Sequence, residues 1–325
     1  MRAIVCQQFG ELDNLSYREY PRPEVGADEV LVRTRAVGVN FPDLLLVKGL
    51  YQAKPTLPFV PGLECAGVID AIGENVTNLK VGDRVAATNP AFTTYAELTA
   101  VPASNAYVLP AGVEDEKAAA LLCAHGTAYH ALSQRAELRP GETLLVTGAA
   151  GGTGLAAVQI GHALGARVIA ACSNEKKLDI AKRHGAEAGI NYRSGDLKAA
   201  VRELTNGRGV DLIYDPVGGS LAEPLSRVLA WAGRWLVIGF ASGEIPNLAL
   251  NLPLVKGYSV VGVFWGTFVQ REPQTARRNH QHLFDLCATG KLQPHIHEVL
   301  PLENAAKALQ MIATRKVNGK IVLKP

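Results

Sequence analysis

A glycine-rich turn at residues 147–154 carries the clearest chemical potential of this 325-residue chain. The apolar run Thr143–Val146 leads into the turn TGAAGGTG, a segment with helical spacing of apolar residues follows, and a second apolar run spans Arg167–Cys172. Glycines let a pyrophosphate approach the backbone and bind the free N–H groups at the start of a helix. The turn therefore predicts a dinucleotide site. The predicted contacts within it are Ala149, Gly151, Gly152, Thr153 and Gly154.

The residues after the second apolar run favour one nicotinamide dinucleotide over the other. NAD-binding folds place Asp or Glu at the end of the second strand, whereas this chain has Ser173 and Asn174 there, with Lys177 one turn further on. Such side chains can bind a 2′-phosphate through charge-assisted hydrogen bonds. We therefore predict NADPH as the cofactor. Further contacts are expected from Tyr192, Val217, Gly239, Phe240 and Phe264, which follow later strands.

Two domains are expected to position these residues. From residue 1 to about 108, short apolar runs separated by Gly, Pro, Asn and Asp predict an antiparallel, barrel-like β domain. From about 143 to 263, strands and helices alternate at the rhythm of a parallel, doubly wound sheet. The predicted fold class is α/β, with residues 1–122 and 266–325 in the β domain and residues 123–265 in the nucleotide-binding domain.

The composition excludes several classes of protein. The chain is 48% hydrophobic, and its 33 basic and 30 acidic residues give a net charge of +3, which offers no broad field for nucleic acid or a membrane surface. Its five cysteines are widely spaced and odd in number, which favours reduced thiols over a disulfide framework. No apolar run reaches the ~20 residues of a membrane span, and we expect a cytoplasmic protein.

Several segments occur in an order that matches a known family. VGVNFPD (Val37–Asp43), PFVPGLECAGVI (Pro58–Ile69), GAAGGTG, DPVGG and NGKIVL (Asn318–Leu323) resemble the zinc-free NADPH:quinone oxidoreductases of the medium-chain dehydrogenase/reductase superfamily. The resemblance implies a GroES-like catalytic domain, a Rossmann domain and usually a homodimer. The apolar segment Tyr258–Trp265 suits a dimer, because it predicts an edge strand that needs covering.

The resemblance also implies an activity, namely NADPH-dependent reduction of a quinone or of an α,β-unsaturated carbonyl compound. It assigns Asn40 and Tyr51 to orienting or polarising the acceptor, and Thr127 to holding the nicotinamide. Conjugate hydride addition suits this sparse acid–base equipment, because it spreads charge over an enolate or hydroquinone anion that solvent can protonate. The apolar stretch Leu44–Val47 predicts a small or hydrophobic acceptor.

Alcohol dehydrogenases of the superfamily hold a catalytic zinc ion at three places, which here carry Asn40, Leu63 and Cys123. Because zinc needs about three protein ligands, we predict no metal and a packing role for Cys123. Two alternatives stay open: a zinc-independent alcohol dehydrogenase, and an NADPH-binding protein with a structural or RNA-binding role. The physiological acceptor and the proton donor are also open at this point.

Overall fold

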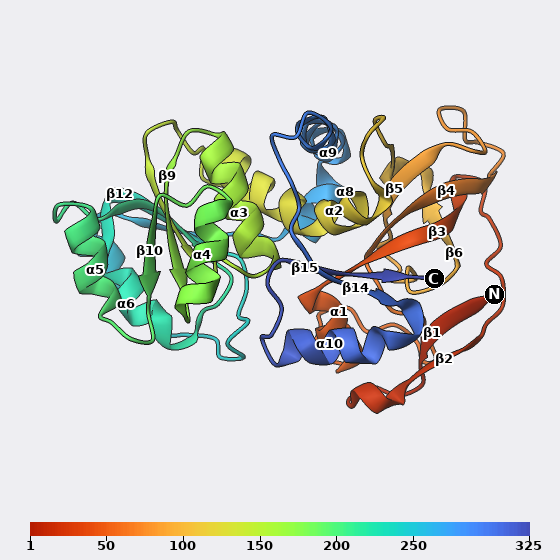
Figure 1. Ribbon diagram of the computed structural model, residues 1–325, viewed down its shortest axis with the longest axis horizontal. Coiled ribbons are helices and arrows are strands. Elements are labelled where there is room, and N and C mark those ends of the chain that lie inside the picture. Colours follow the sequence, from red (N-terminus) through yellow and green to blue (C-terminus); the bar gives the residue numbers. More distant parts are fainter. The chain divides into compact units, whose positions relative to one another are not determined.

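The computed structural model describes residues 1–325 and divides them into two compact units (Figure 1). The first unit comprises Met1–Gly126 and Phe268–Pro325, and the second comprises Thr127–Thr267. The predicted α/β class is confirmed, because the second unit contains a parallel sheet and the first a mainly antiparallel one. No helix is both long and apolar enough to cross a membrane.

The first unit is built on a seven-stranded sheet in the order β14, β15, β3, β4, β5 and β7, with β6 also paired to β3. Its pairs are antiparallel except for β14 with β15, which run parallel and depart from the predicted pattern. β1 and β2 form a separate antiparallel pair. The strands are β1 (Arg2–Cys6), β2 (Leu15–Glu19), β3 (Glu29–Val39), β4 (Glu64–Ile72), β5 (Arg84–Thr88), β6 (Leu98–Pro102), β7 (Ala106–Val108), β14 (Ile296–Pro301) and β15 (Lys320–Lys324).

Helix α1 (Phe41–Val47) begins where β3 ends. Pro42 favours its first turn, and the Asp43 side chain reaches back to accept the Asn40 backbone N–H, as in a capping box. The other helices with residues in this unit are α2 (Asp115–Tyr129), α8 (Trp265–Arg271), α9 (Pro273–Ala288) and α10 (Ala305–Ala313), and α1 packs against α10. α2 and α8 also contribute residues to the second unit.

The apolar stretch Leu44–Val47, from which a small or hydrophobic acceptor was predicted, packs mainly into the core of the first unit. Leu44, Leu46 and Val47 are at most 3% exposed and belong to the core of the first unit. Leu44 and Leu46 are two positions apart and lie on nearly opposite sides of the helix, so α1 is packed on more than one side. Leu45 is half-buried, and the character of the acceptor stays a prediction.

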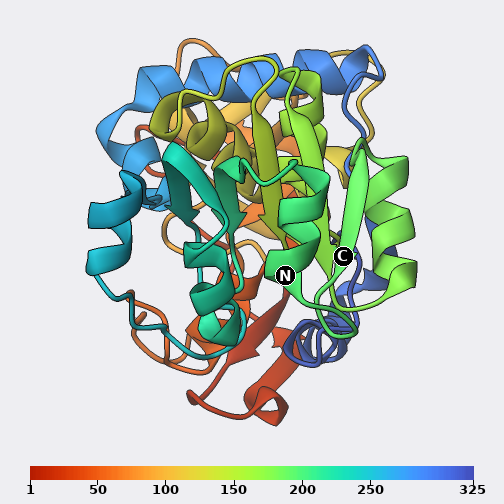
Figure 2. The ribbon, with the colours of Figure 1, turned by 90° about the vertical axis from the view of Figure 1, so that its left-hand side faces the viewer.

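The second unit holds a six-stranded parallel sheet in the order β10, β9, β8, β11, β12 and β13 (Figure 2). This order reverses direction between β8 and β11, which makes that point the topological switch of a Rossmann sheet. The strands are β8 (Thr143–Thr147), β9 (Arg167–Cys172), β10 (Ala188–Asn191), β11 (Val210–Asp215), β12 (Leu229–Val237) and β13 (Ser259–Gly262).

Helices connect these strands, and side chains cap two of them. Helix α4 has Asn174 at its N-cap and α5 has Asp196, and each side chain accepts backbone N–H groups of the first turn. Helix α6 has only five residues, and β12 begins soon after it at Leu229. The helices are α3 (Gly152–Ala163), α4 (Glu175–Arg183), α5 (Leu197–Leu204), α6 (Ala222–Ser226) and α7 (Asn251–Lys256).

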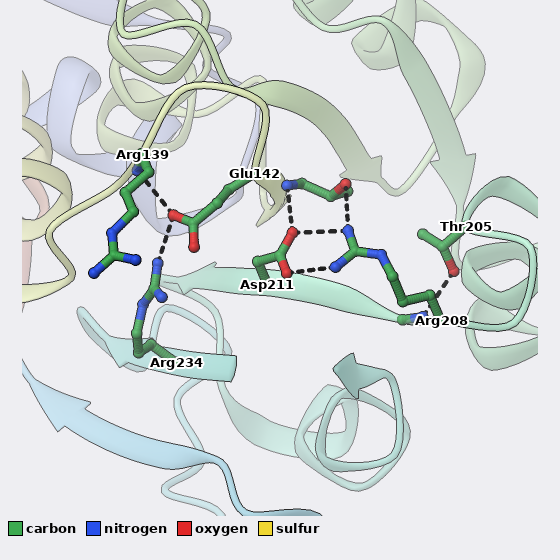
Figure 3. A network of polar contacts seen from close by, with 8 residues as sticks. Arg139, Glu142, Thr205, Arg208, Asp211 and Arg234 are labelled. Carbon is green, nitrogen blue, oxygen red and sulfur yellow. Dashed lines mark hydrogen bonds and ion pairs between the residues drawn. The ribbon is translucent and has the colours of Figure 1, made fainter. Parts of the chain in front are cut away.

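A polar network joins β8, β11 and β12 where they enter the parallel sheet (Figure 3). Asp211 accepts two hydrogen bonds from the Arg208 guanidinium and one from the Thr143 backbone N–H. Burial alone would raise the pKa of Asp211, but these bonds hold it below its usual value. Glu142 accepts from the Arg234 guanidinium at 2.7 Å. Polar side chains thus fasten the amino edge of the sheet, while the carboxyl edge carries the glycine-rich turn.

Candidate functional site

The glycine-rich turn follows β8 directly at the switch point of the parallel sheet. Gly148 has a φ of 56°, a conformation that favours glycine. A Cβ on Gly148 would lie 3.0 Å from a methyl group of Val217, which follows β11. The loops after β8 and β11 therefore meet at the position where doubly wound sheets bind their ligands.

The start of helix α3 lies in this turn and is well suited to an anion. Gly151 is its N-cap residue and no side chain caps the helix, so the positive end of a 12-residue helix is left for a ligand. A Cβ on Gly154 would lie 2.3 Å from the Gly148 carbonyl oxygen, which shows how closely the helix approaches the turn. The hydroxyl groups of Thr153 and Tyr214 share a hydrogen bond. Tyr214, buried in β11, is a residue that the sequence pattern did not single out.

The residues predicted to select NADPH lie at the carboxyl ends of β9 and β10. Ser173 follows β9, and the Tyr192 backbone N–H donates to the Cys172 carbonyl at 3.1 Å. The positive charge of Lys177 is one of the factors that lower the pKa of the Cys172 thiol, although burial dominates and raises this pKa to about 11. The Lys177 ammonium therefore stands near the end of β9. Asn174 caps α4, since its side-chain oxygen accepts the Lys177 backbone N–H at 3.0 Å.

The remaining predicted cofactor contacts lie beside the same edge. Val217 donates its backbone N–H to Asp215 Oδ1 at 3.0 Å, and Thr147 donates its hydroxyl to the same oxygen at 2.6 Å. Gly239 and Phe240 follow β12, and Phe264, 54% exposed, follows β13. The fold thus gathers along one sheet edge every residue that the sequence predicted for the cofactor.

A second polar cluster lies in the first unit around Asn40. The Asn40 side chain donates to Glu64 Oε1 at 2.8 Å and to the Gly38 carbonyl at 3.3 Å, and its oxygen accepts from Lys320 Nζ. Oδ2 of the Asp43 carboxyl group accepts from the Asn40 backbone N–H at 2.8 Å and from the Tyr95 hydroxyl at 3.0 Å. Sequence reasoning found Asn40 but missed the other members.

Tyr51 lies near the same cluster and is half-buried, with its ring edge-on to Phe92 at a centroid distance of 5.9 Å. Burial raises the pKa of its phenol, and the neighbouring Cys123 and Asp43 raise it further. The Tyr51 hydroxyl therefore stays protonated at neutral pH and can donate a hydrogen bond. Thr127 is half-buried in α2 and is the first residue of the second unit.

Comparison with known proteins places these features in a family. Residues 26–111 match the alcohol dehydrogenase GroES-like domain and residues 152–281 match the zinc-binding dehydrogenase family. Quinone oxidoreductase-like protein 2 of Bos taurus is 40% identical over 304 residues, covering 93% of this chain and 86% of its own. The quinone oxidoreductase of Pseudomonas aeruginosa is 36% identical over 325 residues, covering 100% and 99%.

A solved structure agrees. The crystal structure of the Escherichia coli quinone oxidoreductase complexed with NADPH superimposes with a TM-score of 0.94 at 30% identity, covering 100% of both chains. The chain belongs to the quinone oxidoreductase-like family of medium-chain dehydrogenases/reductases. The resemblance inferred from its motifs is thereby confirmed, and the protein is an oxidoreductase.

One of the matching families is the zinc-binding dehydrogenases, so the residues at the three zinc-ligand places are compared with the ligands that zinc needs. The three corresponding places carry the Asn40 amide, the apolar Leu63 and Cys123. Burial raises the pKa of the Cys123 thiol well above its usual value, and zinc binds the thiolate. No group of three or more His, Cys, Asp or Glu side chains that could hold a metal ion is present. This donor set does not fit zinc.

The buried Asp43 carboxyl group predicts that the stability of this oxidoreductase depends on pH. Burial raises its pKa from 3.8 to about 7, despite the hydrogen bond from Asn40 and the charge of Lys320. Because the folded state binds this proton more tightly, the resulting stabilisation is complete below about pH 4 and is lost as the pH rises through about 7. Between these pH values, wild type should lose on the order of 3–4 kcal/mol of unfolding free energy relative to Asp43→Asn.

Urea denaturation of both proteins from pH 4 to 8 measures this difference. An exposed control, Asp179→Asn, should follow the wild-type curve at every pH. Parallel curves for wild type and Asp43→Asn would contradict the assignment of a neutral Asp43.

Proposed function

We propose that this protein reduces a quinone or an α,β-unsaturated carbonyl compound with NADPH. The observation that carries the proposal is the uncapped, glycine-lined start of α3 at the switch point of the sheet. A dinucleotide would suit this position, since its pyrophosphate would accept hydrogen bonds from the backbone N–H groups of the first turn, which includes Thr153. NADPH supplies the hydride when bound. Ser173 and Lys177 would bind the 2′-phosphate.

The proposal assigns orientation of the acceptor to Tyr51 and Asn40, and holding of the nicotinamide to Thr127. The Tyr51 phenol can donate to the acceptor oxygen as that oxygen gains negative charge. Asn40 already uses both amide hydrogens, but the bond to the Gly38 carbonyl is long at 3.3 Å. That hydrogen can be shared with the acceptor oxygen in a bifurcated bond, without rotation of the amide and with the shorter bond to Glu64 kept.

Reduction of an alkene or quinone fits this side-chain set better than reduction of a ketone does. A ketone would leave an alkoxide that needs an acid or a metal ion at once, and the donor set does not fit zinc. A conjugate addition leaves a delocalised anion that water can protonate later. The NADPH complex of the Escherichia coli relative supports the same choice of cofactor.

Transfer of a labelled hydride tests this function. With NADPH deuterated at the transferred position, deuterium should appear on the carbon β to the carbonyl of the reduced enone, as measured by NMR of the product. Deuterium on the carbinol carbon would instead identify a carbonyl reductase. Absence of NADPH oxidation with every quinone and enone in a panel would leave a structural NADPH-binding role as the better account.

We also propose a homodimer through the exposed edge strand β13. Val260 on this strand is 44% exposed, and five further large apolar residues of the same unit are more than 70% exposed. These are Trp231, Ile245, Leu250, Leu254 and Val255. A second copy that pairs with β13 would cover this apolar surface.

Val260→Lys should shift the protein from dimer to monomer, because it places a charge on the proposed interface. Sedimentation velocity at micromolar concentration measures the mass. Val299→Lys is a matched control, since Val299 is 43% exposed on the edge strand β14 of the other sheet and should leave the mass unchanged. A monomeric wild-type protein would refute the proposal.

A further inference from the structure

The ammonium group of Lys320 lies inside the first unit and makes three hydrogen bonds. Lys320 is the first residue of β15 and is only 4% exposed. Its ammonium group donates to the Val39 carbonyl at 2.8 Å, to Glu64 Oε1 at 2.9 Å and to the Asn40 side-chain oxygen. An ammonium has three N–H donors, and all three are used. The position of the ammonium group is therefore fixed by the fold.

Glu64 is the counterpart of Lys320 and is fully buried. Its Oε1 accepts from Lys320 and from Asn40, and its Oε2 accepts the Cys123 backbone N–H at 2.7 Å. One carboxylate thus joins the start of α1, strand β15 and helix α2.

The backbone is shaped to admit this carboxylate. A Cβ on Gly38 would lie 2.4 Å from Glu64 Oε1 and 2.2 Å from the Ala119 carbonyl oxygen. Only glycine fits between β4 and α2 at this point of β3. The close approach of Glu64 is therefore built into three elements.

Stability alone does not explain such a pair. Taking both charges out of water costs about as much as their attraction returns, so an apolar pair of similar volume is often equally stable. What the pair adds is geometry, because it fixes both ends of the Asn40 amide: Lys320 holds the oxygen and Glu64 holds one hydrogen. The second amide hydrogen is thereby kept in one direction.

We infer that Lys320 and Glu64 are a positioning pair for the reductase reaction, which sets the orientation of the Asn40 amide toward the acceptor. The inference rests on the proposed function, in which Asn40 contacts the acceptor. Neither residue of the pair touches the acceptor itself.

A charge-neutral double variant separates positioning from stability. Lys320→Met and Glu64→Gln should each lower Tm by about 10 °C, because each leaves one buried charge without a partner. The double variant Lys320→Met/Glu64→Gln should recover most of this loss. Its kcat with a quinone or enone should nevertheless stay at least about tenfold below wild type, as expected for a misoriented group, while its Kd for NADPH should not change.

The ion pair between Lys324 and Glu116 provides a matched control. It joins the same strand β15 to α2 but is exposed, with side-chain exposures of 51% and 26%. Lys324→Met/Glu116→Gln should keep wild-type kcat and Tm. Wild-type kcat and KM in the Lys320→Met/Glu64→Gln variant would overturn the inference and leave the pair a purely structural one.

Hydrogen exchange of residues 38–47, followed by mass spectrometry, tests whether the Lys320–Glu64 pair anchors the segment around Asn40. This measurement does not depend on enzyme activity. The buried double variant should exchange at least about tenfold faster in this segment than the exposed control, because the start of α1 loses its anchors. Equal exchange would count against the pair. If none of the quinones and enones tested supports NADPH oxidation by the wild-type protein, the proposed function is refuted instead. The exchange result would still decide whether the pair positions Asn40.

Discussion

Gly154→Ala is expected to destabilise the protein by about 1–3 kcal/mol, a typical cost of overpacking, and to weaken NADPH binding more than tenfold. The added Cβ would lie 2.3 Å from the Gly148 carbonyl oxygen and 3.1 Å from the Ala149 Cα. Both are backbone atoms that cannot rotate away, so helix α3 must move or the turn must open. Either movement displaces the N–H groups that are proposed to hold the pyrophosphate.

Two other glycines serve as controls for this effect. A Cβ on Gly195, in an exposed loop, has its nearest neighbour at 3.7 Å, so Gly195→Ala should match wild type in both measurements. A Cβ on Gly151 would contact the Gly148 carbonyl oxygen at 3.3 Å, which needs only a small adjustment. Gly151→Ala should therefore keep its stability and lose affinity, because that glycine lets the backbone approach the pyrophosphate.

Urea denaturation gives the stability of each variant, and fluorescence titration gives its Kd for NADPH. A Gly154→Ala protein with wild-type stability and wild-type Kd would show that the turn relaxes freely. The close contact between α3 and the turn would then not be needed for NADPH binding.

The nucleotide edge could be predicted from the sequence because its chemistry is local. The strand, glycine turn and helix that form it are continuous between residues 143 and 163, and the rhythm of later strands places Val217 and Gly239 on the same edge. Asn174 was predicted as a cofactor contact and is found capping α4, a role that Asn before a helix often has. Local pattern alone does not separate these two uses.

The buried cluster around Asn40 could not be predicted in this way, because its members are far apart in the chain. Lys320 and Glu64 are separated by 256 positions and meet only when β15, β3 and β4 form one sheet. A weaker signal was present, since each is a lone charge inside an apolar strand segment, LECAGVI and GKIVL. A charge in such a segment must find a partner when it is buried, and the two charges are of opposite sign.

The cluster also explains the contacts of Asn40 and Cys123, which stand at two of the places where alcohol dehydrogenases of the superfamily hold zinc. The Glu64 carboxylate accepts from the Asn40 amide and from the Cys123 backbone N–H, so a buried carboxylate ties these two residues together. The nearest cation is the Lys320 ammonium. A covalently attached positive charge thus stands beside the residues that correspond to zinc ligands, and it carries no exchangeable position for an alkoxide.

Lys177→Ala is expected to weaken NADPH binding about ten- to a hundredfold, which corresponds to a charge-assisted hydrogen bond of roughly 1.5–3 kcal/mol. NADH lacks the 2′-phosphate, so its affinity should change little. The Lys177 ammonium is near the carboxyl end of β9 and its side chain is half-buried. The cap uses only the side-chain oxygen of Asn174, so Asn174 stays with Ser173 and Lys177 among the proposed phosphate contacts.

The selectivity of this effect decides between a phosphate contact and a general loss of structure. Titration of both cofactors at two salt concentrations should show that the wild-type preference for NADPH falls with salt, while the variant has little preference to lose. Lys176→Ala, which removes an exposed neighbouring charge, should retain the preference. An equal loss of affinity for NADPH and NADH in Lys177→Ala would mean that Lys177 supports the end of β9 and α4, and the selection of NADPH would then have to come from elsewhere on the edge.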